Sequence, residues 1–260
     1  MFSPRSFAEK PSANQKNCNR ALYFENYNAA DGSNASRRWH VGFAEALGVR
    51  PGVTSVIGSG GKTSLIAALA RELPGTVVLT TTTHILPFPD VPLVTSADAD
   101  DVRAALAESR VVCVGSQAEK NGKLVTPELG IDALASLADY VLVEADGARR
   151  LPLKAHAPWE PVIPACSGRT ILVLGASGLG HPVHEKVHRP ELFCELTGCT
   201  PDDPATPELV ARVADVEALA DVALVNQADV APDTARDLAA LLAILAFAGS
   251  VRVGTIHAAS

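Results

Sequence analysis

Aromatic residues, long apolar runs and clusters of basic residues are all scarce in this chain of 260 residues. Aromatics make up 5% of it, and the 47% that is hydrophobic is mainly Ala, Val and Leu, which disfavours an aromatic-rich β-sandwich. No apolar run reaches the ~18 to 20 residues of a membrane span. With a net charge of −7 and no basic block, the chain is expected to bind neither nucleic acid nor a membrane.

Cysteine is also too sparse and too scattered to form a redox or zinc motif. No two cysteines are spaced as CxxC, which removes the usual dithiol and zinc-finger arrangements. The N-terminus lacks the charged-then-apolar order of a signal peptide. We therefore expect free thiols and a cytoplasmic protein. The cysteines are Cys18, Cys113, Cys166, Cys194 and Cys199.

Short apolar strands alternate with longer helical stretches over most of the chain. This alternation predicts an α/β fold of the P-loop NTPase kind, a doubly wound and mostly parallel sheet with helices on both faces, in one domain over residues 38–260. Residues 1–37 are polar and rich in Asn and Ser, so we expect a loosely ordered extension or a short arm laid on the body. The expected strands are 53–57, 76–81, 110–114, 140–144, 169–174, 222–225 and 251–256, with a hairpin arm at 122–125. The expected helices are 62–73, 98–109, 127–138, 185–196, 207–219 and 231–247.

A glycine-rich run joins the first of these strands to the helix that follows it. Its glycines let backbone N–H groups face phosphate oxygens, and the helix N-terminus adds the positive end of its dipole. Lys62 would reach the β- and γ-phosphates, and the Thr63 hydroxyl would ligate Mg²⁺. The sequence thus predicts a P-loop that holds ATP or GTP with Mg²⁺. The run consists of Gly58, Ser59, Gly60, Gly61, Lys62, Thr63 and Ser64.

The run departs from the full GxxxxGK[ST] pattern at its first position, where Val56 stands instead of glycine. It therefore matches a shorter variant of the loop, of the kind found in Mur-type ligases and related ATPases. A glycine turn that merely precedes a lysine would give the same letters, but the strand before it and the helix after it favour a phosphate loop. Since Lys62 lies on a loop, we expect its side chain at the surface.

Two acidic residues, Glu144 and Asp146, end a strongly apolar strand. P-loop proteins place a carboxylate on a neighbouring strand, where it holds the metal directly or through water. Ligands of open α/β sheets collect at the C-terminal edge of the strands, and strand periodicity points both acids to the same side. Either acid could hold Mg²⁺ together with Thr63. A plain strand end capped by polar residues would explain the pair as well.

Seven motifs together carry a family resemblance that covers about residues 42–256. The chain resembles the selenium-dependent hydroxylase accessory protein family, also called selenium cofactor biosynthesis protein YqeC. The resemblance implies a P-loop fold and a role in the maturation of selenium-dependent molybdenum hydroxylases, which makes such a hydroxylase or its maturation proteins the expected partners. The motifs are the glycine-rich run, Thr80–His84, Glu144–Gly147, Leu151–Lys154, Glu160–Pro164, Val187–Glu191 and Asn226–Asp229.

The resemblance also implies a site for a second substrate. Its residues can hold an anionic group or stabilise a transferring phosphoryl group. A surface or capping role would explain each of them equally well when it is taken alone. The expected substrate residues are Thr82, Lys154, His188 and Arg189. The expected catalytic residues are Lys62, Asp146, His188 and Arg189.

The last motif follows the strand expected at 222–225. It looks like the guanine-reading NKxD element of GTPases, with Gln227 in place of lysine. Its aspartate could accept both guanine N–H donors and would then prefer guanine to adenine. A short turn at the end of a strand explains the same residues. Nucleotide contacts are therefore expected from Asn226 and Asp229, with ATP and GTP both open.

Two further runs imitate known motifs. The residues His184–His188 fit HExxH, but that zinc signature works only on a helix, and Pro182 and Pro190 leave room for about two turns. We expect a short helix with exposed histidines and no zinc. The run Gly175–Gly180 imitates a dinucleotide fingerprint, yet no strand ending in an acid follows ~20 residues later, so we expect a flexible loop.

The motifs together favour an NTPase or an NTP-dependent transferase that acts in maturation of the selenium/molybdenum cofactor. One alternative is a Mur-like ligase, which would make an acyl-phosphate and then an amide, and would form ADP only with a carboxylate substrate. The other is a non-enzymatic, nucleotide-gated chaperone that delivers a selenium or molybdenum species to an apo-enzyme. Such a chaperone would hydrolyse nucleotide slowly until a protein partner stimulated it.

Overall fold

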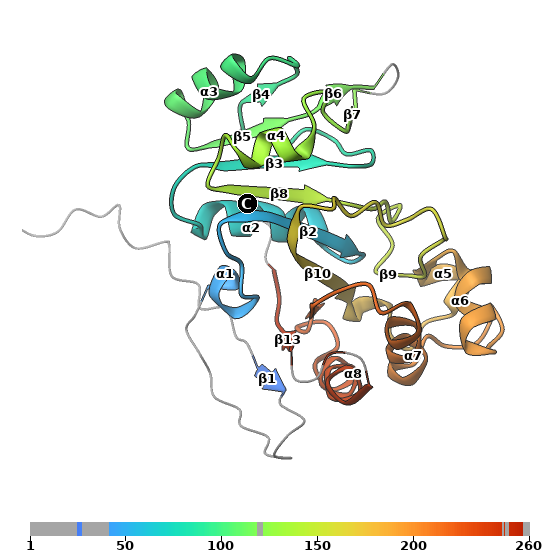
Figure 1. The fold of residues 1–260 in the computed structure, drawn as a ribbon. Coiled ribbons are helices and arrows are strands. Elements are labelled where there is room, and N and C mark those ends of the chain that lie inside the picture. Colours follow the sequence, from blue (N-terminus) through green and yellow to red (C-terminus); the bar gives the residue numbers. More distant parts are fainter. Residues whose placement is uncertain (1–24, 28–41, 119–121, 246, 248–249, 257–260) are drawn as a thin grey trace, which may run out of the picture.

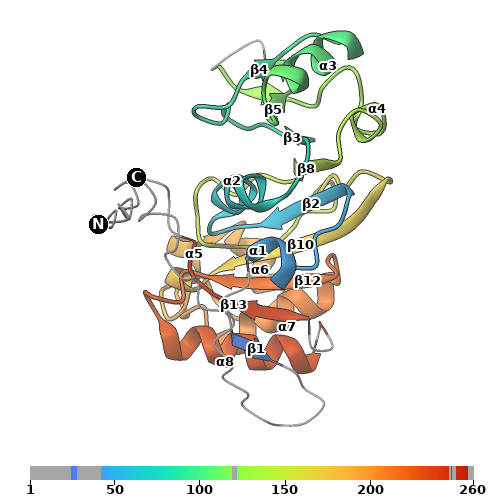
Figure 2. The same cartoon turned by 90° about the vertical axis from the view of Figure 1, so that its left-hand side faces the viewer.

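A computed structural model describes residues 25–27, 42–118, 122–245, 247 and 250–256 of the chain. Its centre is a nine-stranded sheet in the order β1-β13-β12-β10-β2-β8-β3-β5-β4. All neighbouring strands run parallel except β1, which is antiparallel to β13. Figure 2 shows this order from β4 at the top to β1 at the bottom. The prediction of an α/β fold with a mostly parallel sheet is thereby confirmed.

The strands and helices have the following bounds. The sheet contains β1 (Glu25–Tyr27), β2 (Gly52–Gly58), β3 (Val77–Thr81), β4 (Leu93–Val94), β5 (Val111–Val114), β8 (Tyr140–Glu144), β10 (Ser167–Gly175), β12 (Val222–Asn226) and β13 (Val251–Val253). Two small sheets pair β6 (Ser116–Gln117) with β7 (Leu124–Val125) and β9 (Leu153–Lys154) with β11 (Val187–His188). The helices are α1 (Phe43–Ala46), α2 (Lys62–Glu72), α3 (Ala99–Glu108), α4 (Ile131–Ala135), α5 (Val183–Lys186), α6 (Pro190–Thr197), α7 (Pro207–Glu217) and α8 (Pro232–Leu245), with a 3₁₀ turn η1 (Ala176–Gly178).

Helices cover both faces of the sheet because successive residues of its buried strands point to opposite sides. On one face, Val56 and Leu142 belong to the core that contains α1 and α2. On the other face, their neighbours Ile57 and Val143 belong to the core that contains α3, α4, α6, α7 and α8. The continuous apolar character of the strands, which indicated a parallel sheet, therefore reflects burial on both sides.

The expectation of one helix over residues 185–196 is wrong. The segment forms α5, then β11, then α6, and Arg189 between β11 and α6 has a left-handed backbone with φ of 64°. Pro190 is the cause, since its ring removes an N–H and disfavours helical geometry in the residue before it. His184 lies on α5 and His188 on β11, so one helix does not carry both histidines of the HExxH pattern.

Two other boundaries differ from expectation. The helix expected at 127–138 is shorter, because Gly130 has φ of 81° and α4 begins only after it. The run Gly175–Gly180, expected to be a flexible loop, instead contains η1, in which Ala176 and Gly178 are buried. Of the expected N-terminal extension, only β1 belongs to the described residues, and it adds to the sheet beside β13.

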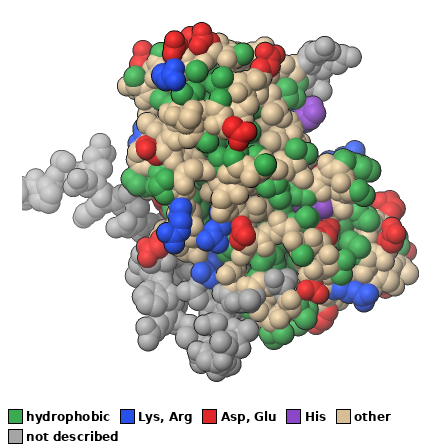
Figure 3. Space-filling view, in the orientation of Figure 1, with side chains coloured by type: hydrophobic (Ala, Val, Ile, Leu, Met, Phe, Trp, Pro, Cys, Tyr) green, Lys and Arg blue, Asp and Glu red, His purple; other side chains and the backbone are tan. Residues whose placement is uncertain are grey.

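Acidic and basic side chains are interspersed on the face of the molecule seen in Figure 3. Among the helices that the structure describes, none is long and apolar enough to cross a membrane. The helix α8, for example, has 14 residues. In Figure 1, the arrowheads of β2, β3 and β8 point to the side of the molecule where β9, α5 and α6 lie. The motif residues after the strands gather there.

Candidate functional site

The glycine-rich turn between β2 and α2 is shaped by backbone geometry that only glycine adopts easily. Gly58, Gly60 and Gly61 have φ of 90°, 83° and 130°. A Cβ atom on Gly60 would collide with the Gly175 backbone at the end of β10, and one on Gly61 would collide with the Asn226 side chain at the end of β12. The turn therefore lies against two neighbouring strand ends, and the N-terminus of α2 opens directly from it.

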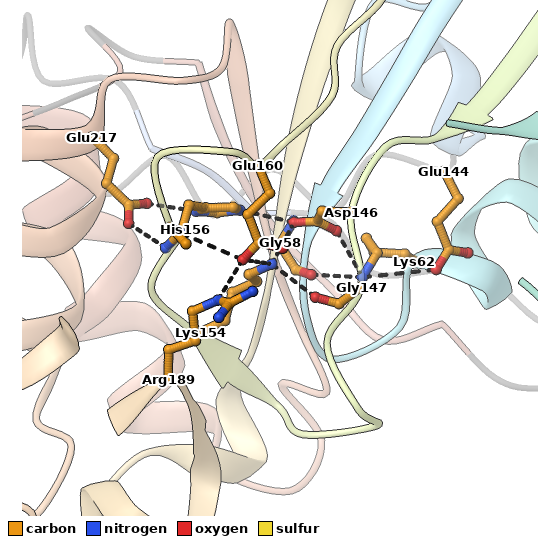
Figure 4. A network of polar contacts seen from close by, with 11 residues as sticks. Gly58, Lys62, Glu144, Asp146, Gly147, Lys154, His156, Glu160, Arg189 and Glu217 are labelled. Atoms are coloured by element: carbon orange, nitrogen blue, oxygen red, sulfur yellow. Dashed lines mark hydrogen bonds and ion pairs between the residues drawn. The ribbon is translucent and has the colours of Figure 1, made fainter. Parts of the chain in front are cut away.

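Lys62 is buried rather than at the surface, contrary to expectation, with a relative exposure of 5%. Its Nζ donates to the Gly58 carbonyl at 2.7 Å and lies 3.0 Å from Asp146 Oδ1. Glu144 Oε1 is 3.8 Å away. Figure 4 shows the ammonium group between these two acids. The side chain is enclosed because β8, which ends with Glu144 and leads into Asp146, is the immediate neighbour of β2.

Thr63 and Glu144 form the second contact between the turn and β8. The Thr63 hydroxyl donates to Glu144 Oε2 at 2.8 Å. Glu144 is the last residue of β8, in register with Val56 on one side and Thr81 on the other. Burial raises the pKa of its carboxyl group, even though Lys62 and Thr63 both act to lower it. A hydroxyl and a carboxylate are oxygen ligands of the type that Mg²⁺ takes.

Asp146 is the buried centre of a network of charges, with a relative exposure of 1%. Its Oδ2 accepts the backbone N–H of Gly58 at 2.8 Å and lies 3.0 Å from Lys154 Nζ. The same oxygen is 2.8 Å from His156 Nε2, while Oδ1 faces Lys62. Burial alone would raise the pKa of Asp146, but Lys62, His156 and Lys154 hold it well below its ordinary range. Asp146 therefore stays ionised, with both oxygens engaged.

His156 joins Asp146 to a third acid, Glu217, at the end of α7. The Nδ1 of His156 is 2.7 Å from Glu217 Oε2, and its backbone N–H donates to Glu217 Oε1 at 2.6 Å. Burial acts to lower the pKa of His156, but the hydrogen bonds to Asp146 and Glu217 raise it overall. An imidazole between two carboxylates donates from both ring nitrogens and so carries a positive charge. The row from Glu217 through His156 and Asp146 to Lys62 crosses Figure 4.

Sequence reasoning missed both His156 and Glu217. His156 lies two residues after Lys154, the spacing that places side chains on the same side of an extended segment, and this was the signal that could have identified it. Glu217 offered no comparable signal, because it comes 61 residues later on another element.

The charge on His156 makes the stability of the fold depend on pH. Its folded pKa is raised, so its contribution is fully present below the ordinary value of about 6.5 and is lost as the pH rises through the folded value. His156→Gln should therefore lower the free energy of unfolding by about 2 kcal/mol near pH 6 and by clearly less near pH 9. Urea denaturation at both pH values measures this. The exposed His184→Gln serves as the control, and a loss for His156→Gln that is equal at both pH values would contradict the assignment.

Lys154 and Arg189, two of the expected substrate residues, meet at Glu160. Glu160 Oε1 lies 3.1 Å from Lys154 Nζ and accepts from Arg189 Nε at 2.8 Å. Burial would raise the pKa of Glu160, but Arg189 and Lys154 lower it overall. The Lys154 side chain is fully buried and also donates to the Gly147 carbonyl at 2.8 Å. The Arg189 guanidinium is more open and lies 5.2 Å from the centre of the Trp159 ring.

The other two expected substrate residues, His188 and Thr82, lie at the rim of this network. His188 is in register with Lys154 where β11 pairs with β9, and its pKa is lowered by burial and then by Lys154 and Arg189. Thr82 follows β3, and its hydroxyl donates to the Val162 carbonyl at 2.6 Å. Thr82 thus holds the segment that carries Glu160 against the end of β8.

Asn226 and Asp229, the two residues expected to contact the nucleotide base, differ in exposure. Asn226 is buried, and its Nδ2 donates to the Gly60 carbonyl at 2.7 Å. Asp229 is exposed, and its Oδ1 accepts the Thr255 hydroxyl at 2.9 Å. Of the two serines in the glycine-rich run, Ser59 is buried and Ser64 is partly exposed on the first turn of α2.

Comparisons with known proteins match the chain to one family. The family described as YqeC protein matches residues 54–191. The uncharacterized protein YqeC of Escherichia coli (strain K12) is 43% identical to the chain over 163 residues, which cover 59% of the chain and 63% of that protein. The chain thus spans less than two thirds of the length of this relative. No solved structure matches it.

Proposed function

The chain belongs to the YqeC protein family, and from this premise we propose that it binds a nucleoside triphosphate with Mg²⁺ and uses it as an NTP hydrolase or NTP-dependent transferase. The observation that carries the proposal is the junction of β2 and α2. There a glycine turn, a helix N-terminus, a lysine and a threonine hydroxyl converge beside an acid of the neighbouring strand. This set provides backbone donors for phosphate, a cation for its charge and oxygen ligands for a metal.

The contacts of the Lys62 ammonium group support the proposal. This group is bound by Gly58 and Asp146, and both contacts lie at the turn where a phosphate would sit. A triphosphate would draw this ammonium group toward its own oxygens. Asp146 would then keep Lys154 and His156 as counter-charges, so the buried carboxylate would stay paired.

We assign Mg²⁺ to Thr63 and Glu144 rather than to Asp146. Thr63 and Glu144 already contact each other through oxygen atoms, and Thr63 is exposed at the turn. Asp146 Oδ2 contacts Lys154, His156 and the Gly58 N–H, and Oδ1 faces the Lys62 ammonium group, so a metal at Asp146 would have to displace a buried cation. Bound to Thr63 and Glu144, Mg²⁺ would neutralise charge on the β- and γ-phosphates.

The remaining motif residues support a transfer reaction to a second substrate. Arg189 offers a planar cation at the open side of the network, held by Glu160 and backed by Trp159. His188 beside it has a lowered pKa, so it can accept a proton from an attacking group near neutral pH. We further propose that this reaction serves maturation of the selenium/molybdenum cofactor of selenium-dependent hydroxylases, a role that rests on the sequence motifs.

Glu144→Gln tests the metal assignment. The amide keeps the shape of the side chain but loses its negative charge, so the gain in NTP affinity caused by Mg²⁺ should fall by about tenfold or more. Binding in EDTA should change little. Titration calorimetry with ATP and with GTP, each with and without Mg²⁺, measures both effects.

The exposed Glu185→Gln is the matched control for this substitution, because it removes the same charge from a helix outside the network. An unchanged Mg²⁺ effect in Glu144→Gln would remove Glu144 from the metal site. Failure of the wild-type chain to bind either triphosphate, with or without the metal, would contradict the proposed function itself.

A further inference from the structure

The ends of β12 and β13 lie beside the glycine turn. In the sheet, β12 is the second neighbour of β2 and β13 the third, on the side opposite to β8 and its acids. A Cβ atom on Gly61 would collide with the Asn226 side chain and lie 3.9 Å from Ile256, so the ends of β12 and β13 lie directly against the turn. A ribose and a purine ring attached to phosphates at the turn would extend along this edge and meet the residues that follow β12 and β13.

These residues are fixed to the glycine turn by hydrogen bonds. Asn226 donates to the Gly60 carbonyl at 2.7 Å, and its Oδ1 accepts the backbone N–H of Ile256 at 2.9 Å. The backbone N–H of Ala228 donates to the Gly254 carbonyl at 3.2 Å. The turn, residues 226–229 and residues 254–256 therefore form one connected edge. Asn226 is the structural link in it rather than a base contact.

Asp229 presents a carboxylate at this edge. It is exposed, and the Thr255 hydroxyl orients it by donating to Oδ1 at 2.9 Å. The backbone N–H of Asp229 donates to the same hydroxyl oxygen at 3.1 Å. Within the described part of the chain, Oδ2 has no hydrogen-bond partner. The result is an oriented carboxylate with free acceptor capacity.

We infer that Asp229 reads the base of the nucleotide and selects guanine, so that the triphosphate is GTP. This inference rests on the proposed function and names its substrate. Guanine presents two parallel N–H donors, at N1 and at the N2 amino group, to which a carboxylate can bind with both oxygens. Adenine presents a lone pair at N1 instead, which a carboxylate repels. Asp229 thus attracts one purine and rejects the other.

A comparison of the nucleotide affinities of the wild type and of Asp229→Asn tests this inference. The wild type should bind GTP at least about tenfold more tightly than ATP, because a bidentate base contact discriminates by about ten- to a hundredfold. Asp229→Asn should weaken the binding of GTP by a similar factor. The same substitution should strengthen the binding of xanthosine triphosphate. Xanthine carries a carbonyl where guanine carries the N2 amino group, and the amide of Asn can donate to this carbonyl. Titration calorimetry with the three triphosphates, in the presence of Mg²⁺, measures these affinities.

Asp233→Asn is the matched control, because it makes the same chemical change at an exposed position on the first turn of α8. It should leave all three affinities unchanged. If the wild type binds ATP as tightly as GTP, or if Asp229→Asn leaves GTP affinity unchanged, the inference is overturned while the proposed function stands. If the wild type binds no triphosphate, both are overturned together.

Discussion

Replacing Lys62 with alanine should weaken the binding of nucleoside triphosphate by about a hundredfold or more. A charged donor aimed at phosphate oxygens in a buried turn contributes about 3 kcal/mol, and each 1.4 kcal/mol corresponds to about a tenfold change in affinity. The backbone amides and the helix N-terminus would remain and would account for the residual binding. Titration calorimetry against the wild type measures the loss.

The burial of Lys62 demands a control for stability. The substitution also removes a cation from Asp146 and Glu144, so the free energy of unfolding should fall by about 1 to 3 kcal/mol. Binding must therefore be measured well below the melting temperature of the variant. Arg71→Ala removes a cation from the exposed last turn of the same helix and should affect neither quantity. Equal affinity in Lys62→Ala and wild type would contradict the phosphate-loop assignment.

Asp146→Ala should destabilise the fold by about 3 to 5 kcal/mol, the usual cost of removing one partner from a buried charge network. The three cations around it, on Lys62, Lys154 and His156, would lose the carboxylate that they share. Urea denaturation at neutral pH measures the loss. Asp202→Asn, which is almost fully exposed, provides the control with a change expected within about 0.5 kcal/mol.

The pH dependence of this loss has a definite sign. The folded pKa of Asp146 is lowered, so its contribution is present above the ordinary value of about 3.9 and is lost as the pH falls through the folded value. A double-mutant cycle with His156→Ala should also be non-additive, because both residues belong to one network. A loss below about 1 kcal/mol for Asp146→Ala would show that the network contributes little to stability.

The parts of the fold that could be predicted are those whose signals are local. The strand Tyr140–Glu144 has the expected bounds, because a run of apolar residues ending in an acid needs no distant partner to be recognised. Helix α2 begins at Lys62 as expected, directly after the glycines. The error at residues 185–196 came from reading helical periodicity through Pro190, where local backbone sterics decide the geometry.

The environment of the site residues could be predicted only in part. The four residues Lys62, Thr63, Glu144 and Asp146 come together because they lie at or just after the ends of adjacent parallel strands, and the sequence order of strands and acids already implies this. The sequence does not show which opposite charges surround a given ionised side chain. Lys154 looked like a substrate contact, yet it is enclosed by carboxylates and a carbonyl. One of these carboxylates, Glu160, comes from the loop that follows β9.

The pairing of β1 with β13 bears on self-association through the sheet. A free edge strand offers a row of unpaired N–H and C=O groups to other chains, and long flat edges promote aggregation. The two outermost strands of this sheet are short, since β4 has two residues and β1 has three. The antiparallel β1 also pairs with the edge of β13 that faces away from β12. Within the residues that the structure describes, neither edge therefore presents a long template for strand addition, and we expect stacking of copies edge to edge to be disfavoured.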